Sequence, residues 1–170
     1  GARGLFDSAT VRAAIRPGNR YDLPKSRLVV VEQTANLGGG TVWPHGQLAE
    51  VVTTAHQHGL ACHLDGARLL NASTHSGLAP RRYAEVFDTA YLDFTKGLGA
   101  PFGAILAGSR DTVEMAWHWK QRLGGSMRQA GVMAAACLYA LDNHVERLAD
   151  DHANAQLLAT RAGDIPGIAI

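Results

Sequence analysis

Short apolar runs alternate with longer amphipathic stretches along the chain. The short runs are bounded by turn residues and are expected as strands at 27–33, 60–64, 89–94 and 102–107. The run at 27–33 (RLVVVEQ) is rich in β-branched residues, which is typical of a strand covered on both faces. Helical spacing and end signals predict helices at 10–15, about 44–58, 79–86, 109–122 and 127–162, the last with a possible break near Asp150.

The alternation of strands and helices predicts an α/β domain, a three-layer sandwich with a mostly parallel sheet. Sheets of this kind bind their ligands beyond the carboxyl ends of the strands. Asp65 and Lys96 each follow a predicted strand directly. We therefore expect these two side chains to share one site.

Composition narrows the partners of the chain. A net charge of +1 does not indicate binding to nucleic acid or to an acidic membrane surface. No apolar run is long enough to cross a bilayer. Cys62 and Cys137 lie inside apolar stretches and are expected as buried free thiols in a reducing compartment. A cytoplasmic protein is the resulting expectation.

Lys96 stands between an apolar strand and a glycine-rich turn that runs to Gly103. A lysine in such a place is partly desolvated, and a desolvated amine can form an imine with an aldehyde. The alternative is an ordinary surface lysine. A dinucleotide-binding role for Gly97-x-Gly99 is disfavoured because the run precedes a strand and does not open a helix.

Asp65 closes the preceding strand and could simply cap the turn that follows. In a functional role, its carboxylate would pair with a protonated ring nitrogen of a cofactor. Arg68 follows three residues later, and its planar guanidinium suits a carboxylate or a ring oxygen. A glycine loop also leads into the last helical region, where Arg128 could add charge to an anion site or merely belong to a loop.

Three motifs in this order, HLDGAR, TKGLGAPFGAILAGS and LGGSMRQAGVMAAACLYAL, closely resemble the threonine aldolase and β-eliminating lyase family of pyridoxal 5′-phosphate (PLP) enzymes. The stretch VEQTANLGGGTVWP is similar to the "ENTHN…GG…LP" stretch of that family, so the resemblance runs from about residue 27 to about residue 155. It implies the PLP-transferase fold type I, also called the aspartate-aminotransferase fold, and a homodimer or homotetramer with shared active sites.

The resemblance also implies roles for individual residues. Lys96 would be the Schiff-base lysine and Asp65 the partner of the pyridine nitrogen. Arg68 would hold the substrate carboxylate and the ring oxygen, and Arg128 the cofactor phosphate or the neighbouring subunit's site. The implied reaction is cleavage of the Cα–Cβ bond of a β-hydroxy-α-amino acid such as threonine, which yields glycine and an aldehyde.

Two departures from the family pattern leave alternatives open. Ala35 stands where the family usually has a histidine near the substrate's β-hydroxyl, and Ser126 replaces a glycine in GGGMRQ. β-Elimination or racemisation on the same scaffold is therefore one alternative to aldol cleavage. A truncated, non-catalytic assembly module is another.

The family's N-terminal part and small C-terminal domain have no counterpart in these residues. The chain starts with Gly1 and closes on an apolar run, so we expect it to be incomplete at both ends. Residues 1–150 are expected as the central and C-terminal part of the PLP-binding large domain. Residues 151–170 are expected as the start of a connection to a missing small domain.

Several further side chains are weaker candidates. His56, His58, Cys62, His63 and Asp65 cluster in the sequence, but two of them close a helix and the others lie on a strand, so no metal site is expected. His63 alternates with Asp65 along the strand and could face the same crevice. Trp117 and Trp119 are expected to serve packing or subunit contacts.

Overall fold

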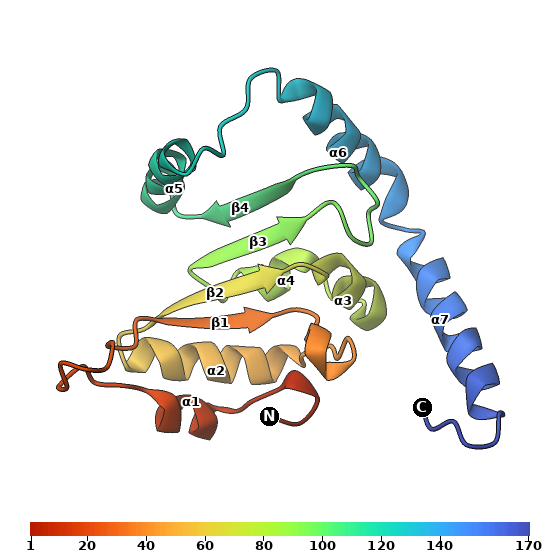
Figure 1. Ribbon diagram of the computed structural model, residues 1–170, viewed down its shortest axis with the longest axis horizontal. Coiled ribbons are helices and arrows are strands. Elements are labelled where there is room, and N and C mark those ends of the chain that lie inside the picture. The colour runs from red at the N-terminus through yellow and green to blue at the C-terminus, as the bar shows by residue number, and fades with distance from the viewer.

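The structure, a computed structural model, describes residues 1–170 and contains one four-stranded sheet (Figure 1). Its strands are β1 (Leu28–Glu32), β2 (Ala61–Gly66), β3 (Thr89–Asp93) and β4 (Ala104–Gly108), in the order β1-β2-β3-β4. β1, β2 and β3 are parallel, whereas β4 is antiparallel to β3. β4 reverses because only a short loop follows β3, and a parallel crossover needs a longer connection. The predicted α/β fold with a mostly parallel sheet is confirmed.

Helices fill the connections and the C-terminal part of the chain. They are α1 (Ser8–Ala14), α2 (His45–Gln57), α3 (Leu69–Ser76), α4 (Pro80–Ala84), α5 (Arg110–Arg122), α6 (Gly131–His144) and α7 (Leu148–Gly163), with two short 3₁₀ turns, η1 (Ala2–Gly4) and η2 (Asn36–Gly38). Each predicted helical region is confirmed, and Ser109 caps α5 as its position suggested. None of these helices has both the length and the apolar character needed to cross a membrane.

The structure differs from the predicted helices in two places: it contains one additional helix, and a break lies at a different position. α3 was not foreseen, because Asn71, Ser73 and Thr74 are weak helix formers. Burial of Leu69 and Leu70 against the rest of the protein stabilises this helix instead. The break expected near Asp150 lies earlier, at residues 145–147, and α7 runs without interruption through residue 150.

The main core lies on one face of the sheet. Val31, Leu64 and Ala90 are buried neighbours across β1, β2 and β3. They belong to a cluster to which α1, α2, α3 and α4 contribute Val11, Leu48, Val51, Leu69, Ala72 and Tyr83. These four helices therefore form one layer over this face.

The opposite face of the sheet is open in this chain. Leu28 and Val30 of β1 are 53% and 49% exposed, so the prediction of a strand covered on both faces is wrong for these residues. Side chains alternate along a strand, and the residues that flank Val31 must therefore point away from the α1–α4 layer. The polar side chains of the candidate site lie on this open face.

A second apolar cluster fixes the loop that follows β3. Phe94 and Leu98 are buried together with Ala140 of α6 and Leu148 of α7. His144 Nδ1 lies 2.6 Å from the Leu98 carbonyl oxygen, which ties the loop to the end of α6. Gly97 lets the loop pack closely against α7, since a Cβ on it would lie 2.8 Å from Leu148 Cδ2. These contacts hold Lys96 at the carboxyl end of the sheet.

Candidate active site

A polar pocket of about 400 Å³ opens at the carboxyl ends of β1, β2 and β3. It is lined by Glu32, Asn36, His63, Asp65, Ala67, Arg68, Tyr91 and Lys96. The structure thus brings together three of the four residues that the sequence singled out, Asp65, Arg68 and Lys96. The volume is in the range of small-molecule sites.

The register of the parallel strands places the acidic residues in this pocket. Glu32 of β1 pairs with Asp65 of β2, and Asp65 pairs with Tyr91 of β3. Neighbours across a sheet share a face, so these three side chains form one row on the open face. Two carboxylates side by side favour a cationic neighbour or ligand between them.

Asp65 serves the turn after β2 and also faces the pocket. Its Oδ1 accepts a hydrogen bond from the Ala67 backbone N–H at 3.1 Å, so the turn-capping role is real. Its Oδ2 has no protein partner and is available to a ligand. The capping and cofactor-binding interpretations of Asp65 are therefore compatible.

The backbone of Arg68 is held by a hydrogen bond, whereas its side chain has no partner in the protein. Its N–H donates to the Gln33 carbonyl oxygen at 3.0 Å. Gln33 is fully buried and is held in turn by Trp43, whose backbone N–H donates to Gln33 Oε1 at 3.0 Å. The Arg68 guanidinium makes no hydrogen bond or ion pair with the protein, so it can bind a carboxylate.

Lys96 contacts a carboxylate that sequence reasoning missed. Its Nζ donates to Asp93 Oδ2 at 2.5 Å. Burial opposes ionisation of Asp93, but hydrogen bonds from Lys96, Thr95 and Tyr91 outweigh this effect and hold the Asp93 pKa well below its usual range. Burial, together with the hydrogen bond to Asp93, raises the pKa of Tyr91 to about 12, so its hydroxyl stays a donor.

Sequence reasoning missed Glu32, Asn36 and Tyr91, which line the pocket, and Asp93, which contacts Lys96. A signal for Tyr91 existed, because it alternates with Asp93 and Thr89 along β3. His63, which was expected as a possible neighbour of Asp65, does line the pocket, and its Nδ1 lies 2.7 Å from Thr89 Oγ1.

Two residues highlighted by the resemblance lie outside the pocket. Arg128 is exposed in the loop between α5 and α6 and does not line it. Ala35 is 5% exposed and belongs to the main core, so a side chain at this position does not face the pocket.

The cluster of histidines, Cys62 and Asp65 separates over two faces of the sheet. His63 and Asp65 face the pocket, whereas His56, Cys62 and Asp88 bring their possible ligand atoms within 4.8 Å of one another elsewhere. The five residues that cluster in the sequence therefore do not converge on one point, although His56 and Cys62 lie close to each other. Burial and the nearby charge of Asp88 raise the Cys62 pKa to about 11, which disfavours the thiolate that a metal needs.

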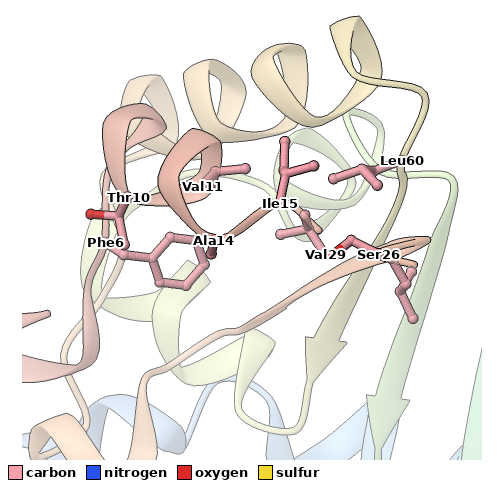
Figure 2. Close-up of a pocket in the computed structure, with 9 residues that line it drawn as sticks. Phe6, Thr10, Val11, Ala14, Ile15, Ser26, Val29 and Leu60 are labelled. Atoms are coloured by element: carbon pink, nitrogen blue, oxygen red, sulfur yellow. The ribbon is translucent and has the colours of Figure 1, made fainter. Parts of the chain in front are cut away.

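A second cavity lies between α1 and the edge of the sheet (Figure 2). It has a volume of about 300 Å³, and its lining is mostly apolar: Phe6, Thr10, Val11, Ala14, Ile15, Ser26, Leu28, Val29 and Leu60. None of these side chains carries an acid, a base or a thiol. The pocket around Lys96, in contrast, is lined by acidic, basic and phenolic side chains.

Solved structures match this architecture over nearly the whole chain. A Listeria monocytogenes protein provisionally described as an L-allo-threonine aldolase matches with a TM-score of 0.84 and 28% identity, covering 98% of this chain and 45% of that one. A threonine aldolase from Leishmania major has the same fold, with a TM-score of 0.79 and 24% identity over 96% of this chain and 48% of that one. The fold of this chain is therefore the α/β fold of the matching half of these solved structures.

Sequence comparison then gives the family. The β-eliminating lyase family model matches residues 1–170, and the chain belongs to that family. It is 37% identical to low-specificity L-threonine aldolase 1 of Arabidopsis thaliana over 98% of this chain and 47% of the relative. It is also 37% identical to the low specificity L-threonine aldolase of Escherichia coli K12 over 93% of this chain and 46% of the relative. The chain spans about half the length of these relatives.

Proposed function

We propose that the protein carrying this chain is a PLP-dependent lyase that cleaves the Cα–Cβ bond of a β-hydroxy-α-amino acid such as threonine to glycine and an aldehyde. The observation that carries the proposal is the convergence of Lys96, Asp65 and Arg68 in one pocket at the carboxyl ends of the parallel strands. The names of the relatives, low-specificity L-threonine aldolases, support the choice of substrate.

The pocket residues fit PLP chemically. Lys96 offers the amine that bonds to the cofactor's aldehyde carbon, and Asp65 offers a free carboxylate oxygen to a protonated ring nitrogen. When bound, PLP supplies an electron sink for the bond that breaks. Glu32 beside Asp65 adds negative charge, which further favours a protonated ring.

The same residues would handle the substrate. The unpaired guanidinium of Arg68 binds the amino acid carboxylate and the cofactor's ring oxygen, and orients the Cα–Cβ bond. The Lys96 amine returns a proton to Cα after the aldehyde has left. Arg128 is exposed and is proposed for the cofactor phosphate or for the site of a neighbouring subunit, on the family resemblance alone.

The substitution at Ala35 does not favour a different reaction. Position 35 is buried in the main core and does not line the pocket, so Ala35 itself contributes no group to the reaction. β-Elimination and racemisation are therefore outcomes of the test below.

The test is product analysis with L-threonine and the full-length protein. Glycine and acetaldehyde should appear in equal amounts, and Lys96→Ala should lower the rate by at least about 10²-fold because the proton-transferring amine is lost. Lys120→Ala is the matched control, since Lys120 is exposed on α5. Release of 2-oxobutyrate and ammonia would indicate β-elimination instead, and loss of optical purity without either product would indicate racemisation.

We further propose a cytoplasmic homodimer or homotetramer with shared sites. Support comes from α5, which exposes the large apolar side chains of Met115, Trp117 and Trp119. Met115 and Trp119 are four residues apart and share one face of the helix, and exposed apolar side chains that share a face are typical of an interaction surface. Both cysteines are free thiols, which agrees with a reducing compartment. The proposed partners are small amino acids, with no role for nucleic acid or membranes.

A further inference from the structure

Asp93 is a buried carboxylate directly below the pocket. It is 8% exposed and ends β3, three residues before Lys96. An ionised carboxylate at such a depth requires several donors to replace water. The surroundings of Asp93 provide four.

The two carboxylate oxygens have distinct partners. Oδ1 accepts from the Thr95 backbone N–H at 2.5 Å and from the Thr95 hydroxyl at 2.6 Å. Oδ2 accepts from the Tyr91 hydroxyl at 2.7 Å and from Lys96 Nζ at 2.5 Å. Three of these donors are neutral, so Lys96 provides the only full positive charge in contact with Asp93.

We propose that Asp93 is a positioning residue for Lys96: its buried carboxylate holds the lysine as an ammonium ion in the pocket and sets the pH at which the amine becomes free to react. This inference rests on the proposed role of Lys96 as the PLP lysine. It assigns to Asp93 and Tyr91 a control over cofactor attachment.

The energetics follow from the contacts. Attachment requires Lys96 to release a proton to solvent and to bond to the aldehyde carbon, whose oxygen leaves as water. Asp93 stabilises the charged lysine and therefore opposes the first step. Once Lys96 has left, Tyr91 and Thr95 still supply three hydrogen bonds, so the carboxylate is never buried without partners.

Other charged and titratable groups face the lysine from every neighbouring element. They are Glu32 on β1, His63 and Asp65 on β2, Arg68 after β2, and Tyr91 on β3. None of them forms a hydrogen bond or an ion pair with Nζ, whose hydrogen-bond and ion-pair partner is Asp93. Asp93 should therefore dominate the pH dependence of attachment.

The test measures the rate of covalent PLP attachment to the full-length apoprotein as a function of pH, with borohydride trapping to locate the label. Asp93→Asn should move the midpoint of this profile down by about 1–3 pH units. Asp93→Glu keeps a carboxylate and should have a midpoint close to that of the wild type. Tyr91→Phe should move the midpoint upward, because Asp93 Oδ2 then has only the ammonium as a partner. Asp88→Asn removes a carboxylate at the far end of β3 and should leave the midpoint unchanged.

The outcomes separate the two proposals. An unchanged midpoint in Asp93→Asn, with PLP still on Lys96, would overturn the role of Asp93 and leave the proposed function intact. If wild-type Lys96 takes no label, the proposed function fails, and NMR of ¹⁵N-labelled lysine side chains then tests Asp93 without PLP. In that experiment the Lys96 ammonium signal should vanish at lower pH in Asp93→Asn than in wild type. Opposite shifts in Asp93→Asn and Tyr91→Phe cannot arise from general damage to the fold.

Discussion

Replacing Gly66 by alanine should separate the two strands that carry the candidate site. Gly66 ends β2 next to Asp65, and a Cβ at this position would lie 2.1 Å from the carbonyl oxygen of Tyr91 on β3. Ordinary van der Waals contact begins at 3.4 Å, and the obstacle is backbone that cannot rotate away. β2 and β3 must therefore move apart, which also moves Asp65 away from Lys96.

The expected cost follows from overpacking. Forced backbone shifts of this kind destabilise by about 1–3 kcal/mol. For a protein unit of this size, that free energy lowers the melting temperature by roughly 2–12 °C. Thermal unfolding followed by circular dichroism measures the stability, and PLP attachment to the same samples measures the site. The melting temperature and the rate of PLP attachment should both be lower in Gly66→Ala than in the parent.

A matched control lies in α2. A Cβ on Gly46 meets nothing within 4 Å, and Gly46→Ala adds a good helix former. This variant should be as stable as the parent or gain up to about 1 kcal/mol. The reasoning is refuted if Gly66→Ala melts at the parent's temperature and attaches PLP at the parent's rate.

Two further predictions concern titratable side chains. Because the folded-state pKa of Asp93 is lowered, its ionic contacts stabilise the fold above the unfolded-state pKa and are lost as the pH falls through the folded-state value. Asp93→Asn should thus lower the unfolding free energy by about 1.5–3 kcal/mol at neutral pH and by much less near pH 2. Urea titration measures both values, and an equal loss at the two pH values would contradict this prediction. With its pKa raised to about 11, Cys62 should be roughly one-thousandth thiolate at pH 8 and should react with iodoacetamide only on unfolding. Labelling of the folded protein as fast as that of free cysteine would count against the burial of Cys62.

The order and type of most elements could be predicted from the sequence. Strands such as β1 and β3 are short apolar runs between turn residues, and their periodicity differs clearly from that of α2. α3 could not be predicted, because its stability depends on Leu69 and Leu70 packing against distant residues. The open face of β1 was also unpredictable, since a β-branched run carries no information on what covers it.

The site was predictable where a residue stands at or just beyond a strand end, or alternates with such a residue along the strand. Asp65 and Lys96 satisfied this rule and converge as expected. The alternation of Tyr91 with Asp93 can be read from the sequence, but the place of Tyr91 beside Asp65 required the register between β2 and β3, which a single sequence does not provide. The role of Ala35 came from motif resemblance alone, and that of Arg128 from the resemblance together with a glycine loop before a helix; neither signal gives the direction of a side chain.

Locating the covalent attachment point of PLP tests the central claim most directly. The full-length protein is incubated with PLP, reduced with borohydride, digested and mapped by mass spectrometry. The account predicts a pyridoxyl group on Lys96, at the edge of the pocket that holds Asp65 and Arg68, and its loss in Lys96→Arg. A pyridoxyl group on Lys25 or Lys120 in place of Lys96 would contradict the account.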